Sequence, residues 1–123
     1  MLKLIAILVM SSTLSVAVET DAGYVERDFP NTEAGAGQLI EFAEKTVGDS
    51  EGGIRVVVGS LGDLNADEPV VNALLAAGVA HGVVSPADIQ ASSTANGLTT
   101  PSAKAVALAD EKRFGFLYRR KKQ

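Results

Sequence analysis

Cysteine is absent from this sequence of 123 residues, and histidine occurs once, at His81. Without cysteine the chain cannot form disulfides, thiol nucleophiles or thiolate zinc sites, and one imidazole cannot build a histidine cluster around a metal. A lone histidine in an apolar run is more typical of a packed or exposed side chain than of a catalytic base. Redox chemistry, zinc chemistry and a Ser/His/Asp arrangement are therefore not expected.

Phosphate-binding glycine motifs are also missing. The loops at 48–53 and 59–62 contain glycines, but neither has the Gly-x-Gly-x-x-Gly spacing or the lysine of a Walker motif. Both loops are interpreted as turns.

Basic residues are scarce outside the C-terminus. The chain has 15 acidic and 11 basic residues and a formal net charge of −4. Four of the basic residues are Arg119, Arg120, Lys121 and Lys122, which leaves 7 against 15, a balance of −8, in residues 1–118. An acidic body does not hold nucleic acid by neutralising phosphates. The four terminal charges are candidates for phosphate contacts, although such ends are more often solvated and frayed.

The length and the apolar content point to one folded unit. With 46% hydrophobic residues, 123 residues suffice for one domain with one core. We assign residues 1–118 to that domain and residues 119–123 to a basic tail.

The N-terminus has two readings. Lys3, the apolar run 4–10 and the small residues Ser15-Val16-Ala17 fit a secretory signal peptide cleaved after Ala17, which predicts export. The run 4–9 also fits a strand buried on both faces, followed by an alternating strand at 13–19. This second reading predicts a cytoplasmic protein, and neither reading predicts a membrane protein.

Hydrophobic periodicity and turn residues predict the remaining elements. In order, they are strands at 4–9, 13–19 and 24–29, a helix after Asn31-Thr32, a strand at 54–58, a helix from Glu68, a strand at 79–84, an irregular or weakly helical segment at 88–98, and a helix starting at Thr100-Pro101. The fourth strand is expected to run parallel to the first, with right-handed crossovers.

Side-chain periodicity predicts which helical residues are buried. The residues expected to be buried are Val70, Val71, Leu74 and Leu75 in one helix and Ala105, Leu108 and Ala109 in the last helix. In the last helix, Lys104 and Asp110 are expected to face water. The element order predicts an α/β RNase-H-like (RuvC-like) fold, a mixed five-stranded sheet with flanking helices.

Two segments carry a resemblance to a known family. Residues 6–17 read Ala-Ile-Leu-Val-Met-Ser-Ser-Thr-Leu-Ser-Val-Ala, and residues 29–35 read Phe-Pro-Asn-Thr-Glu-Ala-Gly. These segments resemble the patterns Gly-Ile-Asp-Val-Ser-Lys-x-Thr-Leu-Asp-Val-Ala and Phe-x-Asn-Thr-x-x-Gly of the RuvC-like DEDD transposases and invertases of the Piv/MooV type, insertion-sequence family one hundred and ten. Weaker matches follow in the same order at 57–62, 74–79, 84–86 and 99–109.

The resemblance implies the domain of a metal-dependent DNA transposase. The residues that carry out the chemistry of that family are, however, replaced in this sequence. The family's four acidic positions correspond here to Leu8, Gly59, Pro101 and Lys104. Because none of these side chains supplies an oxygen ligand, the two magnesium ions of the family are not expected and neither is catalysis. The family's second, C-terminal domain is also expected to be missing from this sequence.

Three functions follow as hypotheses. The first is a truncated, inactive transposase-like protein, either the product of a decaying gene or a domain retained for binding DNA, guide RNA or an intact transposase. The second is an exported small α/β protein. The third is a nuclease or recombinase with relocated ligands, for which the candidates are Asp21, Asp63 and Asp110.

Overall fold

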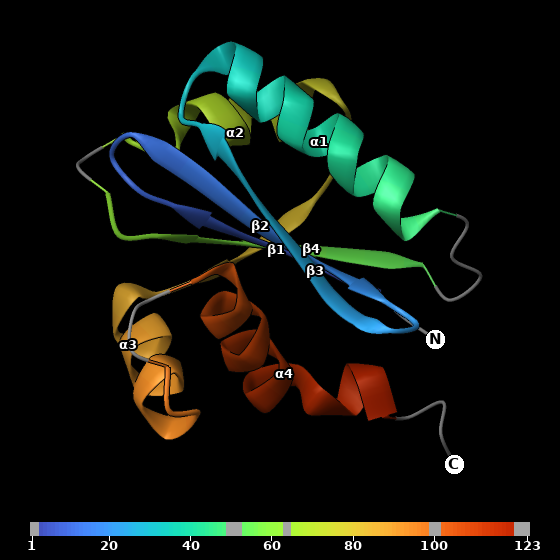
Figure 1. Cartoon of the computed structure of the whole chain (residues 1–123), viewed down its shortest axis with the longest axis vertical. Coiled ribbons are helices and arrows are strands. Elements are labelled where there is room, and N and C mark those ends of the chain that lie inside the picture. The colour runs from blue at the N-terminus through green and yellow to red at the C-terminus, as the bar shows by residue number, and fades with distance from the viewer. Residues whose placement is uncertain (1–2, 49–52, 63–64, 99–101, 120–123) are drawn as a thin grey trace.

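The computed structural model describes residues 3–48, 53–62, 65–98 and 102–119. Its elements are β1 (Lys3–Val9), β2 (Thr13–Thr20), β3 (Gly23–Pro30), α1 (Glu33–Val47), β4 (Ile54–Ser60), α2 (Glu68–Ala76), β5 (His81–Val84), α3 (Pro86–Ala95) and α4 (Ala103–Arg119). The five strands form one mixed sheet in the order β3-β2-β1-β4-β5 (Figure 1). This confirms the predicted mixed five-stranded sheet with flanking helices.

The first three strands form an antiparallel meander, and β4 and β5 continue the sheet in parallel with β1. Ile7 of β1 is paired with Val16 of β2 on one side and with Val58 of β4 on the other. Residues 4–9 are buried throughout, as expected of a central strand that is covered on both faces.

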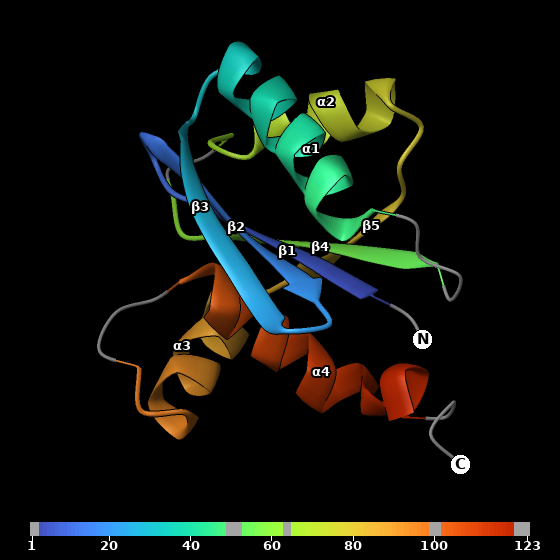
Figure 2. The same cartoon turned by 45° about the vertical axis from the view of Figure 1, so that its right-hand side comes forward.

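Helices cover both faces of the sheet. Figure 2 shows α1 and α2 on one face and α3 and α4 on the other. Successive residues of a strand point to opposite faces, so β1 contributes to two cores. Ile5, Ile7 and Val9 pack under α1 and α2, whereas Leu4, Ala6 and Leu8 pack against α3 and α4.

Several predicted boundaries and orientations are wrong. The segment 88–98, expected to be irregular or weakly helical, is helical as far as Ala95, and its helix α3 begins earlier, at Pro86, where the hydroxyl of Ser85 accepts a hydrogen bond from Asp88 N. The fifth strand begins at His81 rather than Val79. Leu75 is 65% exposed and only Val70 and Leu74 of its helix are buried, because an apolar helix pattern does not reveal how wide a stripe the sheet covers.

The last helix also differs in its buried face. Leu108 and Ala109 are partly exposed, while Ala103, Val106 and Ala107 are buried together with Ala105. Thr100 and Pro101, the predicted start, lie outside the described residues. Among the described residues the hydroxyl of Ser102 accepts a hydrogen bond from Ala105 N at 3.4 Å, which caps the first turn.

Residues that a cleaved signal peptide would remove form the middle of the sheet. Leu4–Val9 belong to β1, and Thr13–Ala17 make up much of β2, with Leu14 and Val16 fully buried. In the described part of the chain, no helix is both long and apolar enough to cross a membrane.

Candidate functional site

Two of the four positions that match the family's acidic residues lie side by side. Leu8 of β1 is the direct register partner of Gly59 in the adjacent parallel strand β4. Leu8 is 1% exposed and belongs to the core that α3 and α4 cover. The ladder therefore brings together the first two matched positions in a dry, apolar environment.

Gly59 is covered by side chains from both helices. A Cβ atom placed there would lie 2.7 Å from Cδ1 of Ile89 on α3 and 3.1 Å from Cγ2 of Val106 on α4. Ile89 and Val106 are fully buried. Hence the absence of a side chain at Gly59 is what lets the two helices pack so closely on the sheet, and Leu8, Ile89 and Val106 fill the volume around it.

Of the other two matched positions, Lys104 does not join this pair. Lys104 is exposed on α4, whereas Ala103, Val106 and Ala107 form the buried face of that helix. Pro101 lies outside the described residues. The residue of α4 that approaches Gly59 is thus Val106 rather than Lys104. These two residues are two positions apart in sequence and point about 200° apart around the helix.

Asp110, predicted to face water, is 2% exposed. Its carboxylate accepts hydrogen bonds from Arg55 Nε at 2.8 Å and Arg55 Nη2 at 2.7 Å. The sequence contains a signal for this pair, because Asp110 follows Ala103 and Ala107 at helical spacing and Arg55 is the one charge within the apolar strand β4. Carboxylate and guanidinium form a matched bidentate pair.

A second polar contact holds α4 against the edge strand β3, on the same face of the sheet. The hydroxyl of Tyr24 on β3 donates a hydrogen bond to Oε1 of Glu111 at 2.7 Å. Asp110 and Glu111 are consecutive, so α4 is attached to β4 and to β3 from neighbouring positions. Both carboxylates act as anchors for the helix.

Of the candidates for a relocated metal cluster, Asp21 and Asp110 are not brought together. Asp21 has a side chain that is 98% exposed and forms an ion pair with Lys3 at 3.4 Å, while Asp110 is paired with Arg55. Asp63 lies outside the described residues. Within residues 3–48, 53–62, 65–98 and 102–119, no group of three or more His, Cys, Asp or Glu side chains is arranged to hold a metal ion. His81 is partly exposed on β5.

In residues 29–35, the segment that best matches the family pattern, each matched residue has a defined structural role. Phe29 is buried, and Asn31 donates from Nδ2 to the carbonyl oxygens of Met10 and Ala66, both at 2.8 Å. The hydroxyl of Thr32 accepts from Gly35 N at 3.0 Å and caps α1. Any side chain at Gly35 would collide with the carbonyl oxygen of Pro30. The segment thus joins three loops at the end of the sheet.

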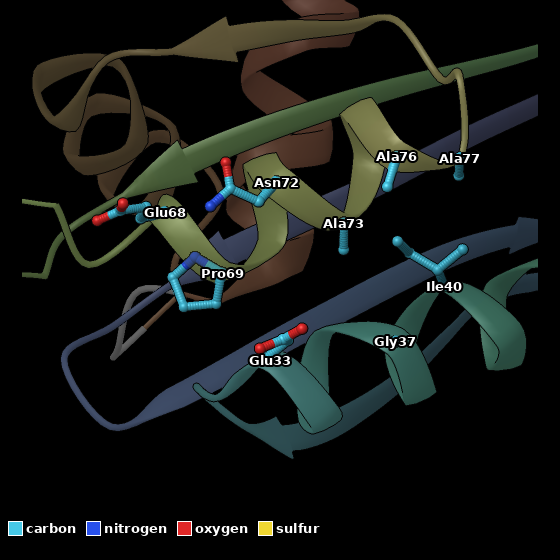
Figure 3. Close-up of a pocket in the computed structure, with 9 residues that line it drawn as sticks. All are labelled: Glu33, Gly37, Ile40, Glu68, Pro69, Asn72, Ala73, Ala76 and Ala77. Carbon is cyan, nitrogen blue, oxygen red and sulfur yellow. The ribbon is translucent and has the colours of Figure 1, made fainter.

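An open depression of about 820 Å³ lies between α1 and α2 (Figure 3). Glu33 and Glu68 stand at one end of it, each in the first turn of its helix, where a carboxylate favours the positive end of the helix dipole. This depression is on the sheet face opposite Leu8. Its lining residues are Glu33, Gly37, Ile40, Glu68, Pro69, Asn72, Ala73, Ala76 and Ala77.

The predicted phosphate contacts are only partly within the described residues. Arg119 is the last residue of α4, and Arg120, Lys121 and Lys122 lie outside.

The arrangement of strands and helices can be compared with solved structures. T. thermophilus RuvC in complex with a Holliday junction substrate is similar to this chain, with a TM-score of 0.56 over 98% of this chain and 96% of RuvC, at 13% sequence identity. The chain has the RNase H-like fold. A Ppx/GppA family protein from Aquifex aeolicus gives a TM-score of 0.46 at 12% identity, over 80% of this chain and 40% of that protein. No family model and no curated protein matches the sequence.

Leu8 and Gly59 can be placed within the RNase H-like fold. The predicted fold is confirmed, and these two residues occupy neighbouring positions on its central parallel strands. The transposase family, by contrast, rests on the residues quoted from the sequence.

Proposed function

We propose that this chain is an RNase H-like domain that acts by binding nucleic acid and does not cut it. The observation that carries this proposal is the apolar cluster of Leu8, Ile89 and Val106 around Gly59. Two-metal phosphoryl chemistry needs several carboxylates that converge on neighbouring metal ions. At this position the chain offers aliphatic side chains and no oxygen ligand.

Magnesium does not fit the residues present. Mg²⁺ requires near-octahedral oxygen coordination, which Leu8 and Gly59 cannot supply from their side chains. Introducing a carboxylate at Gly59 would require Ile89 and Val106 to move. The buried acid on α4, Asp110, is committed to Arg55. No step of a metal-dependent reaction is therefore assigned to this domain.

Nucleic acid is the proposed partner, and the C-terminal residues are the proposed contact. The RuvC structure that shares the fold contains a Holliday junction. Arg119, Arg120, Lys121 and Lys122 are the one dense group of positive charges in a chain whose other residues are acidic in balance. Because the contact would be made by charge alone, we expect weak binding without sequence preference and with strong salt dependence.

A relationship to DEDD transposases of the Piv/MooV type completes the proposal. The ordered matches in the sequence support it, and so does the defined structural role of Phe29, Asn31, Thr32 and Gly35 in the best-matched segment. In this view the domain keeps the scaffold of a recombination enzyme, and buried residues, Leu8 and Gly59, stand at two of its four acidic positions.

The first test asks whether the chain cleaves DNA or binds a divalent metal ion. Duplex and branched DNA are incubated with the full chain and Mg²⁺ or Mn²⁺, and the melting temperature is measured with and without each ion. We expect no cleavage and no metal-dependent rise in melting temperature. Cleavage that a Leu8→Ala variant loses would refute the inactive assignment.

The second test addresses the tail. A variant with Arg119, Arg120, Lys121 and Lys122 all changed to Gln is compared with the parent by fluorescence anisotropy on labelled DNA. The parent should lose affinity steeply between low and moderate salt, and the variant should bind at least tenfold more weakly at low salt. Equal binding by the two proteins would exclude the tail as the contact, and no binding by either would reject nucleic acid as the partner.

A further inference from the structure

The two edges of the sheet differ in charge. The free edge of β3 carries Glu26, Arg27 and Asp28, all exposed, and Arg27 lies over the rings of Phe29 and Phe42 at 5.5 and 5.2 Å. Charged side chains on an edge strand oppose pairing with a strand from another molecule. This edge is thus protected in the way that natural sheets commonly use.

The opposite edge, β5, has no such protection. Residues 69–87 form the longest stretch of the chain without Asp, Glu, Lys or Arg, and they include most of α2 and all of β5. Among the described strands, β4 is the one that pairs with β5. The stretch itself therefore places no charged side chain beside the outer backbone groups of β5, and the charge nearest to the strand is Arg55 of β4, which packs over Gly82 and is paired with Asp110.

Among residues 3–48, 53–62, 65–98 and 102–112, the most exposed large apolar side chains lie in this same stretch. Val83 on β5 is 73% exposed and Leu75 on α2 is 65% exposed. Val84 is buried on the side of α3 and α4, so Val83 faces the side of α1 and α2. Ala73 and Ala76 line the depression toward α1 (Figure 3), and Leu75 is about 200° around the helix from Ala73, on the flank away from α1.

We propose that two copies of this chain associate through the outer edge of β5, which joins their sheets by antiparallel pairing of the two β5 strands. Antiparallel pairing of a strand with its own copy has two-fold symmetry, so one surface serves both partners. Val83 and Leu75 of each copy supply the apolar contact beside the paired strands.

Charge identifies a second copy as the occupant of this edge. Residues 1–118 carry a formal balance of −8, so two copies repel each other wherever acidic faces meet. The stretch 69–87 adds no acidic side chain to this repulsion. Because β5 spans four residues, the contact is small and the dimer is weak. Added salt screens the remaining repulsion and strengthens the dimer.

Sedimentation of the full chain over roughly 10 μM to 1 mM, at low and moderate salt, measures the association. We expect a concentration-dependent dimer that is favoured by salt. Val83→Lys should weaken it at least tenfold. The matched control is Val25→Lys, which places the same change at a 41% exposed valine on β3 and should leave the dimer intact.

Two results would overturn the proposal. A monomer at every concentration would show that the β5 edge does not bind a second copy, and a dimer that Val83→Lys leaves unchanged would place the contact elsewhere. Circular dichroism of each variant checks folding. Since the chain lacks cysteine, Val83→Cys gives a second readout that is independent of stability. A short bis-maleimide should cross-link Val83→Cys into dimers and leave Val25→Cys monomeric; equal cross-linking of both would also contradict the proposal.

Discussion

Asp110 on α4 and Arg55 on β4 form a two-hydrogen-bond ion pair beneath the sheet, with donor–acceptor distances of 2.7 and 2.8 Å. The carboxylate is 2% exposed and the side chain of Arg55 is 23% exposed. A Cβ atom at Gly82 on β5 would lie 2.9 Å from Arg55 Nη2, so the guanidinium occupies the space that a side chain there would need. The pair fixes where the last helix sits along β4.

Removing one member of this pair should cost more than removing both. Arg55→Met leaves the carboxylate of Asp110 buried without its partner, and we expect the free energy of unfolding to fall by about 2–4 kcal/mol. Arg55→Met combined with Asp110→Leu should recover most of that loss. Urea denaturation measures both. Lys45→Met, which breaks the exposed Lys45–Glu41 pair, is the control and should change stability by less than about 0.5 kcal/mol.

Enlarging Gly59 should destabilise the contact between β4 and the two helices beneath it. Gly59→Ala is expected to lower the free energy of unfolding by about 1–3 kcal/mol, because its Cβ meets Ile89 and Val106. Gly59→Ala with Ile89→Val should be more stable than the single variant, since the shorter side chain removes Cδ1. If thermal or urea unfolding shows no such recovery, Ile89 is not the residue that limits the space.

Two glycines on α1 should respond in opposite directions to the same change. Gly35→Ala forces a methyl group into the carbonyl of Pro30 and should cost about 1–3 kcal/mol. Gly37→Ala meets no atom within 4 Å and should stabilise the protein by about 0.5–1 kcal/mol through helix propensity. Melting temperatures of the two variants give the comparison. A stabilising effect of Gly35→Ala would contradict the described join between β3 and α1.

A buried hydroxyl on α3 offers a stabilising substitution. Ser93 is 3% exposed, and its Oγ has no hydrogen-bond partner among the described residues. An unsatisfied buried polar group costs free energy, so Ser93→Ala should raise stability by about 1 kcal/mol. Thr94→Ala removes a hydroxyl that donates to the carbonyl of Gln90 at an exposed position and should have a smaller effect. Equal melting temperatures for Ser93→Ala and the parent would indicate that Ser93 finds a partner in solution.

The strand reading of the N-terminus makes its own prediction. A chain lacking residues 2–17 loses all of β1 and much of β2, so it should show no cooperative unfolding transition by circular dichroism. A chain lacking residues 120–123 is the control and should unfold as the parent does. A stable, cooperatively folded product of the first deletion would support the signal-peptide reading instead.

The sheet was predictable because its strands have clear local patterns. The run 4–9 is continuously apolar, and β4 is a short β-branched segment between glycines, so both read as central strands from the sequence. The helix after Thr32 was predictable from its cap and its apolar spacing. In each of these places the local pattern and the final packing agree.

The interior of the site was not predictable in the same way. The family resemblance matches Gly59 to an acidic position, but only the packing shows that Ile89, from a segment expected to be irregular or weakly helical, lies against it. Asp110 looked like a solvated charge because its partner, Arg55, is distant in sequence and on another element. Long-range pairs of this kind depend on how α4 is placed on the sheet, which local periodicity does not determine.

The packing around Gly59 also constrains what this sequence can become. A glutamate at position 59 would meet Ile89 and Val106, on two different helices, and both side chains would have to shift to admit it. An intermediate with only the glutamate buries an unpaired charge against aliphatic carbon and is selected against for instability. With such a core in place, single substitutions do not easily introduce an acidic residue at this position.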